Sequence, residues 1–185
     1  MIRNDETLTP YQKVLYWFFD YPYLPVSLSE LSGKLHISKS TTYRIVSDLV
    51  DEGFLVMERV GRTWRITCNI SHPYNTTRKV PYHLQLILES SIIDRISDRF
   101  PGCTAIVLFG SYRKGDDIQS SDLDFAVEVP EYRGVKSLNF TRIDLGFRKS
   151  VPVNLLVFSR DKIDLNLFAN IANGIVLRGF LEVKP

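Results

Sequence analysis

A polar turn at residues 108–115, Leu-Phe-Gly-Ser-Tyr-Arg-Lys-Gly, has the residue types and spacing that could hold a phosphate group. Gly110 lets backbone N–H groups approach an anion closely, and the hydroxyl of Ser111 adds a hydrogen-bond donor. Arg113 and Lys114 bring positive charge to the same turn, and charged donors make the stronger hydrogen bonds to phosphate. The turn is therefore expected to bind phosphate.

Two acids follow a few residues later, in Ser-Asp-Leu-Asp-Phe at residues 121–125. Side chains alternate along an extended segment, so Asp122 and Asp124 share one face while Leu123 and Phe125 point to the other, into the core. Mg²⁺ is usually held by one or two carboxylates together with substrate phosphates and water. The pair therefore predicts a Mg²⁺ site beside the phosphate loop.

The elements around these two stretches alternate between helix and strand. The apolar, β-branched run at residues 104–109 predicts a buried strand that delivers its C-terminal end to the Gly-Ser turn. A stripe of apolar residues at helical spacing predicts a helix from Tyr82 to Phe100 that lies on the sheet. The other expected elements are a partly helical segment over 134–149, an apolar strand over 151–158 and a helix over 162–173 closed by Gly174.

The two motifs in this order resemble the nucleotidyltransferase family related to DNA polymerase β, and look most like its minimal members, over roughly Tyr82 to Gly179. By that resemblance the catalytic positions are Asp122, Asp124 and Asn154, and the two acids would hold two Mg²⁺ ions. The residues expected at the nucleoside triphosphate (NTP) are Gly110, Ser111, Arg113, Lys114 and Ser121.

The chain departs from the family pattern at Asn154, in Val-Asn-Leu-Leu at residues 153–156, where minimal nucleotidyltransferases usually have a third acid. An amide oxygen can ligate Mg²⁺, but an amide carries no charge and cannot serve as a general base. Glu128 shares the face of the acid pair but lies too far along its strand to replace Asn154. Asp144 and Asp161 stay open as substitutes for the missing acid. The enzyme assignment is left open: either a transferase weakened by Asn154 or a nucleotide sensor.

The first 70 residues predict three helices and a hairpin, the layout of a winged helix. Helical periodicity covers 11–19, a Ser-Leu-Ser-Glu capping box at 27–30 begins a second helix, and Ser38 caps a third that ends at Gly53. Two strands, 55–60 and 63–67, flank a tight Gly61-Arg62 turn.

Residues 37–44, Ile-Ser-Lys-Ser-Thr-Thr-Tyr-Arg, resemble the winged helix-turn-helix domains of prokaryotic transcription regulators, with the resemblance covering about residues 11–68. The start of the third helix and the hairpin offer polar and basic side chains for a DNA groove and its phosphates. Docking to a protein is the alternative role. The expected DNA contacts are Lys39, Ser40, Thr41, Tyr43, Arg44, Arg59, Arg62 and Arg65.

The whole chain predicts an α+β protein: a winged helix over 1–70, a linker over 71–80 and an α/β nucleotidyltransferase-like domain with a mixed sheet over 81–185. The chain has 185 residues and a net charge of only +2, so its overall charge neither requires nor excludes a nucleic-acid partner. Cys68 and Cys103 are too few and too isolated for a disulfide framework and fit a reduced compartment. The longest apolar run is too short for a membrane span, so a cytoplasmic protein is expected.

The resulting hypothesis is a DNA-binding transcription regulator with a domain that binds Mg-NTP and transfers a nucleoside monophosphate (NMP) to a protein or RNA hydroxyl. One alternative is a catalytically degenerate regulator that senses nucleotide. Related minimal transferases modify a partner toxin, so an antitoxin role is a further alternative. The sequence leaves open the acceptor, the base preference and the oligomeric state, including a homodimer.

Overall fold

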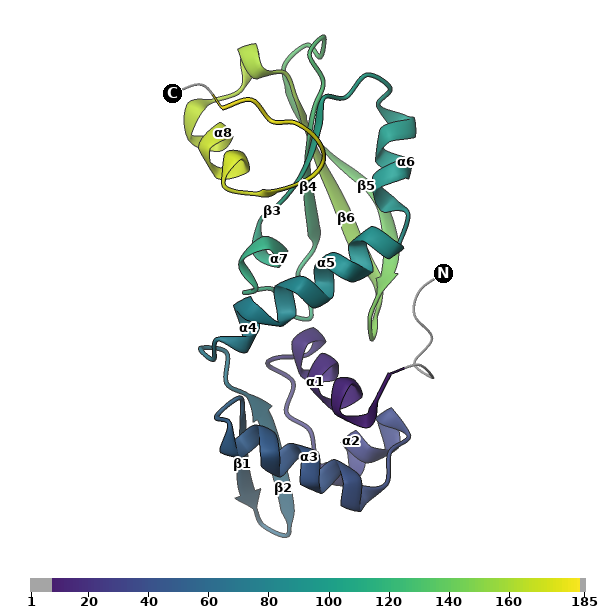
Figure 1. The fold of residues 1–185 in the computed structure, drawn as a ribbon, viewed down its shortest axis with the longest axis vertical. Helices are drawn as coiled ribbons and strands as arrows, with labels where there is room; N and C mark the ends of the chain where they lie inside the picture. Colours follow the sequence, from purple (N-terminus) through teal and green to yellow (C-terminus); the bar gives the residue numbers. More distant parts are fainter. Residues whose placement is uncertain (1–7, 184–185) are drawn as a thin grey trace. The chain divides into compact units, whose positions relative to one another are not determined.

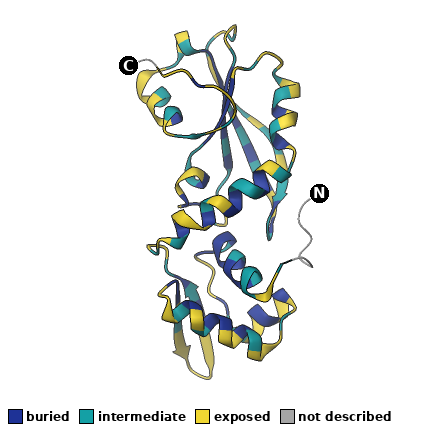
Figure 2. Ribbon diagram, viewed as in Figure 1, coloured by how far each residue is buried: buried dark blue, intermediate teal, exposed yellow. Residues whose placement is uncertain are grey.

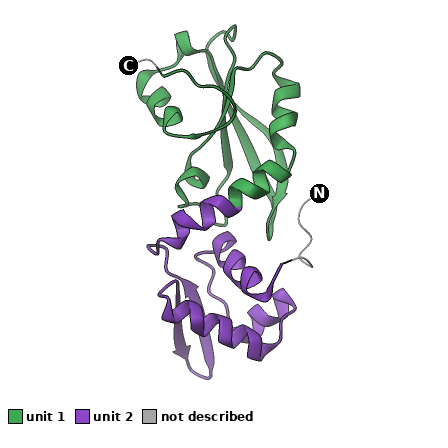
Figure 3. Ribbon diagram, in the orientation of Figure 1, with its two compact units in different colours: residues 1–2, 83–185 green, residues 3–82 purple. Residues whose placement is uncertain are grey.

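The computed structural model describes residues 8–183 and has the predicted α+β class. The chain divides into two compact units, one formed by residues 3–82 and the other by residues 1–2 and 83–185 (Figure 3).

The N-terminal unit has the predicted three helices and hairpin (Figure 1). Side-chain oxygens cap each helix: Thr9 and Gln12 form a capping box, Ser27 accepts from Glu30 N, and Ser38 accepts from Thr41 N, which satisfies backbone donors that a helix start leaves exposed. The bounds are α1 Pro10–Asp20, α2 Leu28–Leu35, α3 Lys39–Asp51, β1 Leu55–Val60 and β2 Thr63–Cys68. The core is made by Val14, Phe18, Leu31, Val46, Leu49 and Phe54, each fully buried.

The segment expected to be a linker contains a short helix, α4 Tyr74–Thr77. Asn75 is buried there, and its Nδ2 donates to the backbone oxygens of Asn69, Ile70 and His72. These side-chain bonds to the backbone order the segment. A helix held by such bonds needs no apolar periodicity, so the sequence does not predict it.

The C-terminal unit is built on a five-stranded sheet in the order β5-β6-β4-β3-β7. β4 runs parallel to β6 and the other neighbours are antiparallel, so the sheet is mixed, as predicted. The strands are β3 Ala105–Phe109, β4 Leu123–Glu128, β5 Val135–Leu145, β6 Arg148–Phe158 and β7 Ile175–Gly179. The central strands β3 and β4 are buried along most of their length (Figure 2).

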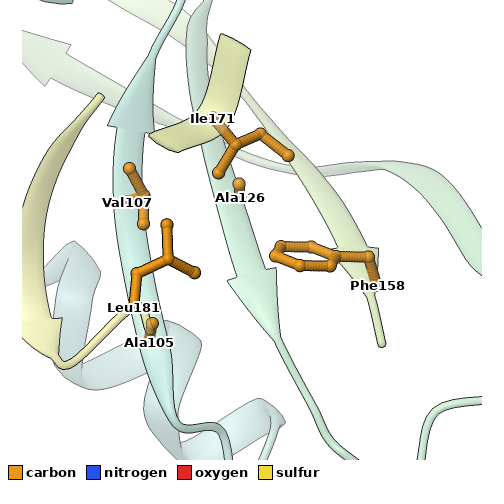
Figure 4. Close-up of a cluster of buried hydrophobic side chains, with 6 residues drawn as sticks. All are labelled: Ala105, Val107, Ala126, Phe158, Ile171 and Leu181. Atoms are coloured by element: carbon orange, nitrogen blue, oxygen red, sulfur yellow. The ribbon is translucent and has the colours of Figure 1, made fainter. Parts of the chain in front are cut away.

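One face of this sheet is covered by α8, Leu165–Ala172, which follows the short 3-10 turn η2, Arg160–Lys162. Ile171 of α8 packs with Val107, Ala126 and Phe158, and Leu181 of the C-terminal tail joins the same cluster (Figure 4). Asp124 lies on β4 two residues before Ala126 and therefore on the same face of the sheet. The acid pair is thus on the α8 face, where the sheet extends past the helix-covered cluster.

The opposite face carries α6, Ile92–Arg99. Arg95 Nη2 donates to Thr141 Oγ1 of β5, and Arg178 Nη1 of β7 donates to Asp94, so α6 is tied to both edge strands. The prediction of one helix over 82–100 was wrong. The helix breaks between α5, Lys79–Glu89, and α6 at Ser90 and Ser91: Ser91 has φ 58°, and the Ser90 hydroxyl donates to the oxygen of Ile87.

The prediction of partial helix over 134–149 was also wrong, because this segment forms β5 and the turn into β6. β5 is an edge strand whose side chains are exposed or half-buried except for Leu145, and its register shifts between Asn139 and Thr141 and again between Ile143 and Leu145. Each shift interrupts the alternation of inward and outward residues. The strand therefore lacks the regular pattern that identifies β-structure in a sequence.

Candidate functional site

The turn that the sequence predicts to bind phosphate, the predicted phosphate loop, begins where β3 ends. Gly110 has φ 74° and ψ −152°, and a Cβ placed on it would lie 2.8 Å from Asp124 Oδ2. Both the positive φ and this close approach require glycine. The single-turn helix α7, Ser111–Lys114, follows directly; Ser111 is half-buried, and Arg113 and Lys114 are exposed.

The strand register brings the three predicted catalytic side chains together. Asp124 pairs with Phe109 of β3 on one side and with Asn154 of β6 on the other. Asn154 Nδ2 donates to Asp122 Oδ2 at 3.1 Å and to Asp124 Oδ1 at 3.3 Å. Asp122, Asp124 and Asn154 are each half-buried, so they form a polar cluster that a ligand can reach from solvent.

Burial raises the pKa of Asp124, and the negative charge of Asp122 raises it further, while the hydrogen bond from Asn154 opposes the shift. Two carboxylates held close together favour a cation between them, because a cation offsets their repulsion. Within residues 8–183 no cluster of three or more His, Cys, Asp or Glu side chains has the arrangement of a metal site.

The donor set at this point suits one Mg²⁺: two carboxylates, with substrate phosphates supplying the remaining charged oxygens. The amide of Asn154 turns its nitrogen toward the carboxylates, so in this orientation it is a hydrogen-bond donor. Only a rotation that exchanges its nitrogen and oxygen would make it a metal ligand.

None of the other acids considered as a third carboxylate lies beside the pair. Glu128 is at the far end of β4, where it accepts from Thr104 Oγ1 and Arg160 Nε, and Asp161 follows the same end of β6 in η2. Asp144 accepts from Ser150 N and Lys149 Nζ at 3.0 Å each. The hydrogen bond from the backbone N–H of Ser150 lowers the pKa of Asp144 most, and the hydrogen bond from the Lys149 side chain lowers it further.

Buried polar contacts also hold the segment between α7 and the acid pair, and sequence reasoning missed them. Arg148 donates to Tyr112 OH of α7 and, at 2.6 Å, to the backbone oxygen of Ser121, the residue before Asp122. His83 Nδ1 lies 3.5 Å from Asp117 Oδ1, with both side chains almost fully buried. Through its two hydrogen bonds, the guanidinium of Arg148 joins α7 to the segment that leads into Asp122.

Ser121 itself has a structural contact. Its hydroxyl accepts from the backbone N–H of Ile118 at 2.9 Å, which shapes the turn into β4. The predicted role of Ser121 at the nucleotide therefore stays a prediction.

The N-terminal unit presents a second candidate site, on α3 and the hairpin. Lys39, Tyr43 and Arg44 are exposed on α3. The hydroxyls of Ser40 and Thr41 both contact Ser38 Oγ, at 3.1 and 2.8 Å, so these two residues take part in the helix cap.

The residues of the hairpin that are predicted to contact DNA lie on two different faces. Arg59 pairs with the exposed Trp64, while Arg65 pairs with Glu58 in the adjacent register position. Neighbouring pairs in a two-stranded ribbon point to opposite faces. Arg59 and Arg65 therefore cannot contact the same groove from one face, and Arg62 lies in the turn between the strands.

Comparison with known families gives two matches. Residues 89–174 match the family described as a nucleotidyltransferase domain, and residues 24–59 match the IclR helix-turn-helix domain. The first span holds the Gly-Ser turn, the acid pair and Asn154, and the second holds α2 and α3.

The chain thus joins a helix-turn-helix domain of IclR type to a nucleotidyltransferase domain, which confirms the predicted fusion. The comparison with curated proteins found no match. Within the described part of the chain, no helix is long and apolar enough to cross a membrane.

Proposed function

We propose that this protein is a DNA-binding transcription regulator whose nucleotidyltransferase domain binds Mg-NTP and transfers NMP slowly. The observation that carries the proposal is the hydrogen bonding of Asn154 to both Asp122 and Asp124 beside Gly110. The loop and the acid pair have the pattern expected of a nucleotide site, while the third catalytic position, Asn154, carries no charge.

Each part of the site has a separate task in this proposal. The backbone at Gly110 and the side chains of Ser111, Arg113 and Lys114 hold the phosphates. Asp122 and Asp124 hold Mg²⁺, which when bound supplies positive charge for the phosphates and the departing pyrophosphate.

The Asn154 amide fixes the two carboxylates, but an amide accepts no proton at neutral pH. Removal of the proton from the acceptor hydroxyl is therefore left to solvent, and a positioned base typically contributes ~10² to 10⁴ in rate. Slow transfer follows from this, with nucleotide binding preserved.

The DNA-binding part of the proposal is supported by the helix-turn-helix match and by the exposed basic residues on α3 and the hairpin turn. Slow transfer would let the bound nucleotide persist, which suits a domain whose occupancy adjusts DNA affinity. A protein acceptor such as a partner toxin, the cytoplasmic location and a homodimer stay predictions.

Incubation of the full chain with ATP labelled at the α-phosphate, Mg²⁺ and host lysate tests transfer. We expect a weak labelled product that disappears when Asp122 and Asp124 are both replaced by Asn. Labelling by that double variant at the wild-type rate would contradict the assignment of the site.

A further inference from the structure

The backbones of the two acids are held in different ways. Asp124 lies within β4 and pairs with residues of both neighbouring strands. Asp122 comes just before Leu123, the first residue of β4, and it follows residues 115–121, which form neither helix nor strand. Strand pairing therefore fixes Asp124, whereas the backbone position of Asp122 depends on the contacts that hold the 115–121 segment.

The helix that follows Gly110 also depends on outside contacts. α7 has only four residues, Ser111–Lys114, and a single helical turn is not stable alone because its few hydrogen bonds do not offset the cost of starting a helix. Tyr112 is the one buried residue of these four. Its ring lies 4.8 Å from that of His83 between centroids, and its hydroxyl accepts a hydrogen bond from Arg148. Tyr112 thus anchors α7, and with it the adjacent Ser111.

A single buried guanidinium holds both α7 and the 115–121 segment. Arg148 is the first residue of β6, pairs with Leu145 across the turn from β5, and is 5% exposed. Its Nη1 donates to Tyr112 OH, and its Nη2 donates to the backbone oxygen of Ser121 at 2.6 Å. Because a guanidinium is planar and rigid, its two nitrogens hold their partners at a fixed separation. Arg148 therefore sets the position of Ser121, and of Asp122 after it, relative to α7.

A buried arginine is a poor choice for stability alone. Taking a guanidinium out of water costs free energy, and an apolar side chain of similar volume often stabilises a fold equally well or better. A further buried polar contact, between His83 Nδ1 and Asp117 Oδ1 at 3.5 Å, holds the same segment. What such contacts supply is a defined geometry, which a binding site needs to within a fraction of an ångström.

We propose that Arg148 is a positioning residue for Mg-ATP. Its two hydrogen bonds fix α7 and Asp122 at the separation that lets one nucleotide meet the predicted phosphate loop with its phosphates and the acid pair with its Mg²⁺. Arg148 acts through Tyr112 and Ser121 rather than by touching the nucleotide or the metal. The inference rests on the proposed Mg-NTP function and names a residue on which the affinity of that site depends.

The test is calorimetric titration of the full chain with ATP, with and without Mg²⁺, at a temperature where circular dichroism shows the variants to be folded. Arg148→Met fills a similar volume but loses both hydrogen bonds. It should weaken Mg-ATP binding about tenfold or more, and it should reduce the gain in ATP affinity that Mg²⁺ provides, because Asp122 is no longer held in place. A purely structural role would leave this Mg²⁺-dependent gain unchanged in the folded protein.

Tyr112→Phe is the milder variant and decides the question if Arg148→Met does not fold. It removes only the hydrogen bond between Arg148 and α7, while the ring stays against His83 and the bond to Ser121 remains. Mg-ATP binding should weaken about threefold to tenfold, the usual effect of one hydrogen bond. The gain in affinity due to Mg²⁺ should stay at its wild-type size, because Asp122 keeps its support.

Arg160→Gln is the matched control for loss of an arginine. Arg160 donates to Glu128 at 2.8 Å and to Glu182 at 3.1 Å, and Glu128 ends β4 whereas the acid pair lies at its start. Arg160→Gln should lower the melting temperature and leave Mg-ATP affinity unchanged. Wild-type Mg-ATP affinity in Tyr112→Phe or in folded Arg148→Met would overturn the inference and leave the proposed function intact. A wild-type chain that binds no Mg-ATP would overturn the proposed function, and the inference with it.

Discussion

The carboxylate of Asp124 packs directly against Gly110, so that a Cβ on Gly110 would come within 2.8 Å of Asp124 Oδ2. This contact joins the end of β3 to the start of β4 and sets the distance between the phosphate loop and the acid pair. A side chain at position 110 would have to displace the carboxylate, because the three nearest heavy atoms to that Cβ all belong to the side chain of Asp124.

Gly110→Ala should therefore reduce Mg-ATP affinity at least tenfold, which isothermal calorimetry can measure. Gly102→Ala is the matched control: Gly102 has φ 85°, and nothing lies within 4 Å of a Cβ built there. Both variants carry the strain of a positive φ, so a difference in Mg-ATP affinity between them should come only from displacement of the Asp124 carboxylate. Equal Mg-ATP affinity in the two variants would mean that the contact has no role in binding.

Asn154→Asp should raise NMP transfer by ~10² to 10⁴, the usual contribution of a positioned general base. It adds a third carboxylate beside Asp122 and Asp124 at nearly unchanged volume. Its control is Asn166→Asp, the same change at an exposed position of α8 away from the acid pair. Rapid transfer already present in the wild type, without any gain in Asn154→Asp, would show that Asn154 does not limit the reaction.

Asp124 should make stability depend on pH in a defined direction. Burial and Asp122 raise its pKa above 3.8 in the folded state, so the folded chain binds more protons than the unfolded chain between 3.8 and the raised value. The contribution of this group to the free energy of unfolding therefore falls as pH rises through that window. Asp124→Asn should remove this pH dependence and raise the melting temperature at pH 7 without Mg²⁺, as measured by calorimetric melts. A lower melting temperature for Asp124→Asn at pH 7 would contradict the raised pKa.

DNA binding should depend on the exposed basic residues of α3 and the hairpin turn. Each phosphate contact contributes about 0.9 to the slope of log affinity against log salt. Arg44→Ala and Arg62→Ala together should therefore reduce the slope by up to about 1.8, measured by fluorescence anisotropy with duplex DNA. Arg65→Ala is the comparison, because Arg65 faces away from Arg59 and pairs with Glu58. A double variant with the wild-type salt slope would place the DNA-binding face elsewhere.

The sequence was most informative where a short motif follows a regular apolar strand. Gly110, Asp122 and Asp124 could be placed because residues 104–109 and 123–127 have the pattern of buried strands, and the strand at 151–158 brought Asn154 to the same face. The edge strand β5 could not be placed in this way, because its two register shifts interrupt the alternation of inward and outward side chains.

Arg148 shows a different limit of sequence reasoning. Its partners, Tyr112 and Ser121, lie 36 and 27 residues away in the chain, and the segment around Arg148 was expected to be helical. A buried arginine has no local sequence signal when its hydrogen bonds are all long-range. Such a residue is found only once the strands are in register.

The most direct test of the central claim is calorimetric titration of the full chain with ATP, with and without Mg²⁺, for the wild type and for the double variant Asp122→Asn, Asp124→Asn. Asn keeps the shape of each side chain and a hydrogen-bond acceptor while removing the charge, so the fold should be retained, and circular dichroism can check this. We predict Mg²⁺-dependent ATP binding in the wild type and its loss in the folded double variant. Equal Mg²⁺-dependent affinity in the two proteins would contradict the account.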